Sequence, residues 1–163
     1  MAKQQSQEIP ENYKQLEGSE RHPSKTARLI GPANDNEVFK VTIILRRRLD
    51  GSPIPDFDYY AKTPLKARTR LSTDEFAKKY GAHTDEIKKV VKFIEDAGLK
   101  VIETRPERRT IIVSGTTAQM SNAFAVPLNN YEHEIVRGGQ DKTPIKEIYR
   151  GRDGFIYVPQ DLA

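Results

Sequence analysis

The fold of this chain is decided at residues 71–98, which read LSTDEFAKKYGAHTDEIKKVVKFIEDAG. Ser72 and Glu75 have the spacing of a capping box, in which each side chain bonds the backbone N–H of the other at the start of a helix. Gly81 is placed to end this short helix in the left-handed conformation. The stretch therefore begins with one complete helix signal.

A second, amphipathic helix follows in the same stretch. Thr84 is placed to cap it and Gly98 to end it. Apolar residues recur at the three- and four-residue spacing of one helix face, namely Ile87, Val90, Val91, Ile94 and Ala97. Because such a stripe must be buried, this helix needs a sheet or another helix to lie on.

Segments rich in β-branched residues predict strands on both sides of the two helices. Residues 37–48 form a first strand, and residues 100–104 and 109–113 form a hairpin joined by the turn RPER. A short helix is predicted over about residues 117–124, and VPLNNYEHEI, residues 126–135, is a fourth strand.

This order of elements is typical of a ferredoxin-like (split βαβ) fold of the α+β class. In that fold an antiparallel sheet carries both helices on one face and leaves the other face open. We expect a flexible N-terminal arm at residues 1–36 and a C-terminal docking segment at residues 148–163. Between them, residues 37–147 form the ferredoxin-like domain, with a long loop at residues 49–70.

The open face of the predicted sheet is the candidate binding surface. Alternate side chains of a strand point to opposite faces, and the second face of the first strand is only half polar. Apolar residues on a face that no helix covers suit a protein partner, unless the long loop, the arm or the tail covers them within the monomer. With three aromatic residues of the tail added, the predicted partner-binding residues are Val38, Lys40, Thr42, Ile44, Thr110, Ile112, Tyr149, Phe155 and Tyr157.

Composition and motifs exclude several kinds of site. The chain has no cysteine, which excludes disulfides and thiolate metal sites, and its three histidines lack metal-ligand spacing. No phosphate-binding glycine motif is present. The stretch Ser114–Ala118 superficially resembles the serine-nucleophile signature of subtilisin-like enzymes, but a turn and a helix cap explain it. We therefore expect no catalytic residue, no cofactor and no metal site, so that the segment is not an enzyme by itself.

Nucleic acid and membrane are not expected partners. The balance of 27 basic and 23 acidic residues gives a net charge of only +4, and the arginines at 46–48 and 105–109 are interpreted as solvated strand ends. No run of about twenty apolar residues is present, and the N-terminus lacks the apolar core of a signal peptide. The strand order also fits RNA-recognition motifs, but residues 109–113 lack the aromatic platform of that family.

Four stretches together resemble the activation domain, or pro-domain, of the sedolisins, which are serine-carboxyl peptidases, and specifically the pro-kumamolisin type. They are VTIILRRR at 41–48, LSTDEFAKKYGAHTDEIKKVVKFIEDAGLKV at 71–101, RRTIIVSGTTAQMSNAFAVPL at 108–128 and IYRGRDGFIYVPQDLA at 148–163. The resemblance implies a fold similar to subtilisin-type propeptides.

The resemblance also implies a role in a zymogen. A pro-domain of this type is an intramolecular chaperone and inhibitor that covers the cleft of its cognate peptidase domain, in cis or in trans, until acid triggers autoprocessing. The resemblance further implies that the Ser-Glu-Asp catalytic residues belong to the peptidase domain and that the precursor is secreted. The alternatives are a ferredoxin-like RNA-binding domain and a free-standing protein-interaction or inhibitor domain.

Overall fold

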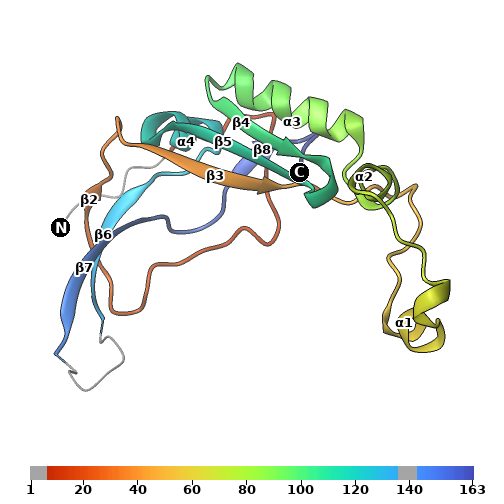
Figure 1. The fold of residues 1–163 in the computed structure, drawn as a ribbon. Helices are drawn as coiled ribbons and strands as arrows, with labels where there is room; N and C mark the ends of the chain where they lie inside the picture. Colours follow the sequence, from red (N-terminus) through yellow and green to blue (C-terminus); the bar gives the residue numbers. More distant parts are fainter. Residues whose placement is uncertain (1–6, 136–142) are drawn as a thin grey trace. The chain divides into compact units, whose positions relative to one another are not determined.

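A computed structural model describes residues 7–135 and 143–163 of the chain (Figure 1). The fold is mixed α+β, and its described strands form three small sheets. The chain divides into two compact units, which are Met1–Phe39 with Ala97–Leu99 and Gly115–Ala163, and Lys40–Asp96 with Lys100–Ser114. The predicted arm and ferredoxin-like domain include residues 1–6 and 136–142, which lie outside the described residues.

A three-stranded sheet carries the candidate surface. Its strands are β3 (Val38–Ile44), β4 (Lys100–Arg105) and β5 (Thr110–Thr116), in the order β3-β5-β4. The predicted hairpin is confirmed, because β4 and β5 pair antiparallel, with a short 3-10 helix, η2 (Pro106–Arg108), between them.

Strand β3 also runs antiparallel to β5. The N–H of Leu45, just after β3, donates to the carbonyl of Arg109 at 2.7 Å, and the N–H of Thr117 donates to the carbonyl of Glu37 at 2.9 Å. The end of each strand therefore meets the start of the other. Strand β5 lies between β3 and β4, which is the order that a split βαβ unit requires.

Helices α2 (Thr73–Tyr80) and α3 (Thr84–Asp96) confirm the two helices predicted at residues 71–98. The capping box is present, because the Ser72 hydroxyl accepts the N–H of Glu75 at 3.3 Å and the Glu75 carboxylate accepts the N–H of Ser72 at 2.8 Å. These bonds lower the pKa of Glu75. In the predicted stripe Val90 and Ile94 are buried and the other three residues are half-buried, and the helix lies along one face of the sheet (Figure 1).

Gly81 follows the end of α2 as predicted, but the predicted left-handed conformation was wrong. This residue is extended, with φ −74° and ψ −166°, rather than left-handed. A Cβ atom at this position would lie 2.4 Å from the carbonyl oxygen of Ala77 and 2.6 Å from that of Pro106. Glycine is required here because two backbone segments approach closely, not because of φ.

The cap of α3 also differs from the prediction. Thr84 is the first residue of the helix rather than its cap. The imidazole of His83 caps the helix instead, because its Nδ1 accepts the N–H of Asp85 at 3.2 Å. At the other end Gly98 has φ +73°, the left-handed conformation expected of it. The helix therefore has the predicted extent with a different cap.

Two arginines after β3 bind the C-terminus of α2. A guanidinium nitrogen of Arg47 donates to the carbonyl of Tyr80 at 2.8 Å, and Arg48 donates to the carbonyl of Lys78. Carbonyls at a helix end lack intrahelical partners and favour cations. The interpretation of these two side chains as solvated strand ends was therefore wrong. Arg48 also pairs with Asp50 at 2.9 Å, which lowers the pKa of that carboxyl to about 2.

The long loop at residues 49–70 has local structure that the sequence did not predict. It contains helix α1 (Phe57–Lys62), capped by the Asp56 side chain, and a 3-10 helix, η1 (Leu65–Ala67). The Arg68 guanidinium donates to two carbonyls within the loop, at 2.9 and 2.7 Å. The loop is thus organised by its own contacts.

The other unit contains the two remaining sheets. One has the order β2-β6-β7, with β2 (Arg28–Pro32), β6 (Asn129–Ile135) and β7 (Ile145–Gly151). The second is a ribbon of β1 (Tyr13–Gln15) and β8 (Tyr157–Pro159). All described pairs in these sheets are antiparallel.

This arrangement confirms the α+β class of the prediction and does not show the ferredoxin-like topology. The predicted fourth strand exists as β6, but its described partners are β2 and β7, so a four-stranded ferredoxin-like sheet is not what the described residues form. Strands β1 and β2 lie within the predicted arm at residues 1–36, which therefore contributes to two sheets. The sequences of these two strands, YKQ and RLIGP, have no hydrophobic pattern from which they could have been predicted.

Helix α4 (Thr117–Ala123) follows β5 and confirms the predicted short helix. It begins with a second capping box, formed by Thr116 and Gln119, and the Thr117 hydroxyl donates to the carbonyl of Glu37. Met120 and Ala123 are buried.

The capping box of α2 provides a test of this account. Replacing Ser72 with Ala removes the acceptor of the Glu75 N–H, and we expect the free energy of unfolding to fall by about 1 kcal/mol. Ser72→Thr, which keeps a hydroxyl, should retain most of it. Urea denaturation of both variants checks this, and equal stability of Ser72→Ala and the unsubstituted chain would contradict it.

Candidate partner-binding surface

Strand β3 presents one exposed row of side chains. Val38, Lys40, Thr42 and Ile44 are exposed, whereas the three residues between them are half-buried. The two apolar members at the ends of the row, Val38 and Ile44, are 64% and 71% exposed. The predicted alternation of this strand is therefore present.

Strand β5 divides in the same way. Ile111 and Val113 are completely buried, and Thr110 and Ile112 are half-buried on the opposite face of the strand. Since α3 covers one face of this sheet, the less buried rows of β3 and β5 mark the other face (Figure 1). We call this surface the open face; its predicted residues are Val38, Lys40, Thr42, Ile44, Thr110 and Ile112.

An ion pair on β4 also belongs to the open face. Glu103 is opposite Ile112 and Arg105 is opposite Thr110, and directly paired residues of antiparallel strands share a face. The Arg105 guanidinium lies 2.6 Å from the Glu103 carboxylate. The open face thus combines apolar side chains with a charged pair, a mixture typical of protein interfaces.

Sequence reasoning missed this pair for a physical reason. The register of the hairpin shifts between Val101 and Glu103. Plain alternation along β4 would place Val101 and Glu103 on the same face of the sheet. The register shift instead turns Glu103 to the face opposite Val101. The only signal in the sequence was the proximity of Glu103 and Arg105, and alternation alone could not assign their face.

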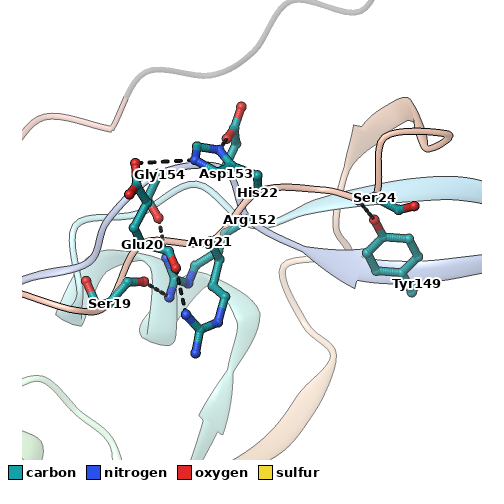
Figure 2. Close-up of polar contacts among 9 residues, drawn as sticks. All are labelled: Ser19, Glu20, Arg21, His22, Ser24, Tyr149, Arg152, Asp153 and Gly154. Carbon is teal, nitrogen blue, oxygen red and sulfur yellow. Dashed lines mark hydrogen bonds and ion pairs between the residues drawn. The ribbon is translucent and has the colours of Figure 1, made fainter.

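The tail residue Tyr149 contacts the N-terminal arm. Its ring stacks on Tyr131 with 5.7 Å between centroids and lies 4.8 Å from the ring of His133. Its hydroxyl accepts the N–H of Ser24 at 3.1 Å, as Figure 2 shows. This predicted docking residue therefore holds two segments of the same unit together.

The other two tail residues are also half-buried within this unit. Tyr157 belongs to β8, where it pairs with Gln15, and its N–H donates to the carbonyl of Phe124 at 2.9 Å. Phe155 lies just before it and is half-buried. The structure thus brings together the predicted residues of β3 with those of β5, while the tail residues engage segments of their own unit.

The described residues include no cluster of three or more His, Asp, Glu or Cys side chains able to hold a metal ion. His83 lies 3.7 Å from Asp85 and His133 lies 3.7 Å from Glu147. His22 contacts two carboxylates, a feature that sequence reasoning also missed. Among the helices in the part of the chain that the structure describes, none has the length and apolarity to cross a membrane.

A sequence model of the pro-kumamolisin activation domain matches residues 25–163. The chain belongs to this family. Residues 41–48, 71–101, 108–128 and 148–163, which carried the resemblance, all lie in the matched range. The α+β fold and the open sheet face described above are therefore those of an activation domain.

Two known proteins are similar to this activation domain over most of its length. Tripeptidyl-peptidase sed5 of Aspergillus fumigatus is 32% identical over 152 residues, which are 90% of the chain and 26% of the relative. Kumamolisin of Bacillus sp. strain MN-32 is 28% identical over 148 residues, which are 91% of the chain and 25% of the relative. The chain spans about a quarter of the length of these proteins.

The different burial of Ile111 and Ile44 predicts that the same substitution changes the free energy of unfolding by different amounts. Ile111→Ala should lower the free energy of unfolding by about 2 to 5 kcal/mol, because it leaves a cavity in the core. Ile44→Ala, the same change at an exposed position, should cost less than about 1 kcal/mol. Thermal or urea unfolding of the two variants tests this, and a large loss in Ile44→Ala would show that the face is covered within the monomer.

Proposed function

We propose that this activation domain is the pro-segment of an acid-activated serine-carboxyl endopeptidase, and that it both assists the folding of the peptidase domain and blocks its cleft. Membership of the family supports association with a cognate peptidase domain. In this proposal the pro-segment works in cis within a secreted precursor, needs no cofactor and performs no catalysis of its own.

One observation carries the choice of binding surface, namely the exposure of apolar side chains on the open face. Val38 and Ile44 lie in solvent on a strand whose opposite face is half-buried. Burying apolar area is the main favourable term in most protein association. We place the peptidase contact on this face, with the tail residues Tyr149, Phe155 and Tyr157 supporting the C-terminal docking segment.

We also propose a ferredoxin-like arrangement for the sheet that carries the open face. The antiparallel order β3-β5-β4 with α3 on one face supports a propeptide-like sheet that docks by its uncovered side. The RNA-binding alternative gains no support from β5, because its seven residues include no aromatic side chain for base stacking.

Inhibition of the cognate mature peptidase tests the proposal. The purified chain should inhibit the peptidase at neutral pH, and Ile44→Asp should weaken inhibition by about 2 kcal/mol or roughly 30-fold, because it places a charge in the buried contact. Lys88→Asp, on an exposed side chain of α3, is the matched control and should leave the inhibition constant unchanged.

Two results of this assay would overturn parts of the proposal. Full peptidase activity in the presence of excess chain at neutral pH would contradict the inhibitory role. Equal inhibition by Ile44→Asp and the unsubstituted chain would retain the role but move the contact away from the open face. Far-UV circular dichroism of each variant establishes that it is folded.

The proposed release by acid has a defined direction. Carboxylates that are paired in the complex favour the bound state while they are ionised, so the stability of the complex falls as the pH drops through their bound-state pKa values. Affinity should therefore be lower at about pH 4 than at about pH 7. A binding series that is flat across this range would remove the acid trigger from the proposal.

A further inference from the structure

Two short segments far apart in the sequence meet in the unit formed by the arm and the tail. We call residues 19–24 and 149–154 together the arm–tail junction (Figure 2). Arg21 and Gly154 exchange backbone hydrogen bonds, with N–H to carbonyl distances of 3.0 and 2.8 Å. The guanidinium of Arg152 donates to the carbonyls of Ser19 and Gly154. The backbone of the junction is thus held in a fixed register.

The ring of His22 lies between two carboxylates at this junction. Its Nδ1 is 2.8 Å from Oδ1 of Asp153 in the tail, and its Nε2 is 3.3 Å from Oε1 of Glu20 in the arm. A neutral imidazole has one N–H and one lone pair, whereas an imidazolium donates from both nitrogens. Only the protonated ring can therefore donate to both ionised carboxylates at once, so the observed geometry fits a charged His22.

The other charged groups at the junction do not replace this role. Arg21 donates to the backbone carbonyl of Glu20, and Arg152 is engaged with two carbonyls, so neither guanidinium is bonded to the carboxylates that face His22. Burial and the positive charge of Arg21 lower the pKa of Arg152. Without the histidine proton, the two carboxylates face an uncharged ring, and the summed charge of these three side chains becomes more negative by one unit.

We propose that the arm–tail junction is a proton-operated clasp, in which protonated His22 joins Glu20 of the arm to Asp153 of the tail and deprotonation loosens the connection. The inference does not depend on the proposed function, because every group in it belongs to this chain. In this proposal, a protonation equilibrium in the N-terminal arm controls how firmly the C-terminal segment is held.

The direction of the pH effect follows from the sign of the shift. The hydrogen bond to Asp153 is the main reason that the pKa of His22 is raised above its usual value of 6.5, and the charges of Glu20 and Asp153 add to it. A raised pKa stabilises the folded junction fully below the unfolded value, and this contribution disappears as the pH rises through the folded value. On the acid side the clasp persists while the two carboxylates remain ionised.

Nuclear magnetic resonance of the full chain tests the clasp directly. A titration from about pH 5 to about pH 9 follows the ring signals of all three histidines. We expect His22 to titrate above 6.5, and both Asp153→Asn and Glu20→Gln to lower its pKa, with the larger effect from Asp153→Asn. The matched control is Glu147→Gln beside His133, which should leave His22 unchanged.

A second measurement asks whether the proton tightens the junction. Amide exchange at Arg21 and Gly154, corrected for the intrinsic pH dependence of exchange, should be slower below the pKa of His22 than above it. His22→Gln should abolish this difference. A His22 pKa at or below 6.5, no response to Asp153→Asn, or exchange that is independent of the His22 proton would each overturn the proposal. Peptidase inhibition is not a readout in either experiment, so failure of the clasp and failure of the inhibitory role are distinguishable.

Discussion

The complete burial of Ile111 and Val113 on one face of β5 is the constraint on which the open face depends. Because side chains alternate along a strand, fixing these two residues in the core commits their neighbours to the opposite face. The same alternation in β3 leaves Val38 and Ile44 in solvent. A slip of one residue would bury the wrong set, so the packing of the core also determines the composition of the open face.

The features that sequence reasoning predicted well are those with short-range signals. The capping box of Ser72 and Glu75, the stripe of α3 and the hairpin of β4 and β5 each depend on residues within a few turns of one another. The alternation of β3 is equally local, and for that reason the exposed row of the open face was predictable. Whether that row binds a partner is a separate question and stays a prediction.

The features that were missed depend on partners distant in the sequence. The sequence of strand β2, RLIGP, does not alternate regularly between apolar and polar residues. The strand forms because β6, about a hundred residues later, supplies its hydrogen bonds. His22 and Asp153 are 131 positions apart, so no spacing rule could join them. The arginines after β3 were misread for a related reason: their acceptors are carbonyls at the end of α2, and main-chain acceptors leave no trace in composition.

The pairing of β1 with β8 has a consequence for the order in which the chain folds during synthesis. The unit of Lys40–Asp96 and Lys100–Ser114 has all its residues available once Ser114 has been made. Strand β1, by contrast, pairs with β8, which is added only when residues 157–159 are made. The sheet that carries the open face can thus form on the ribosome while the N-terminal arm is still waiting for the last strand of the segment. The pairing of β1 therefore forms only after residues 157–159 have been translated.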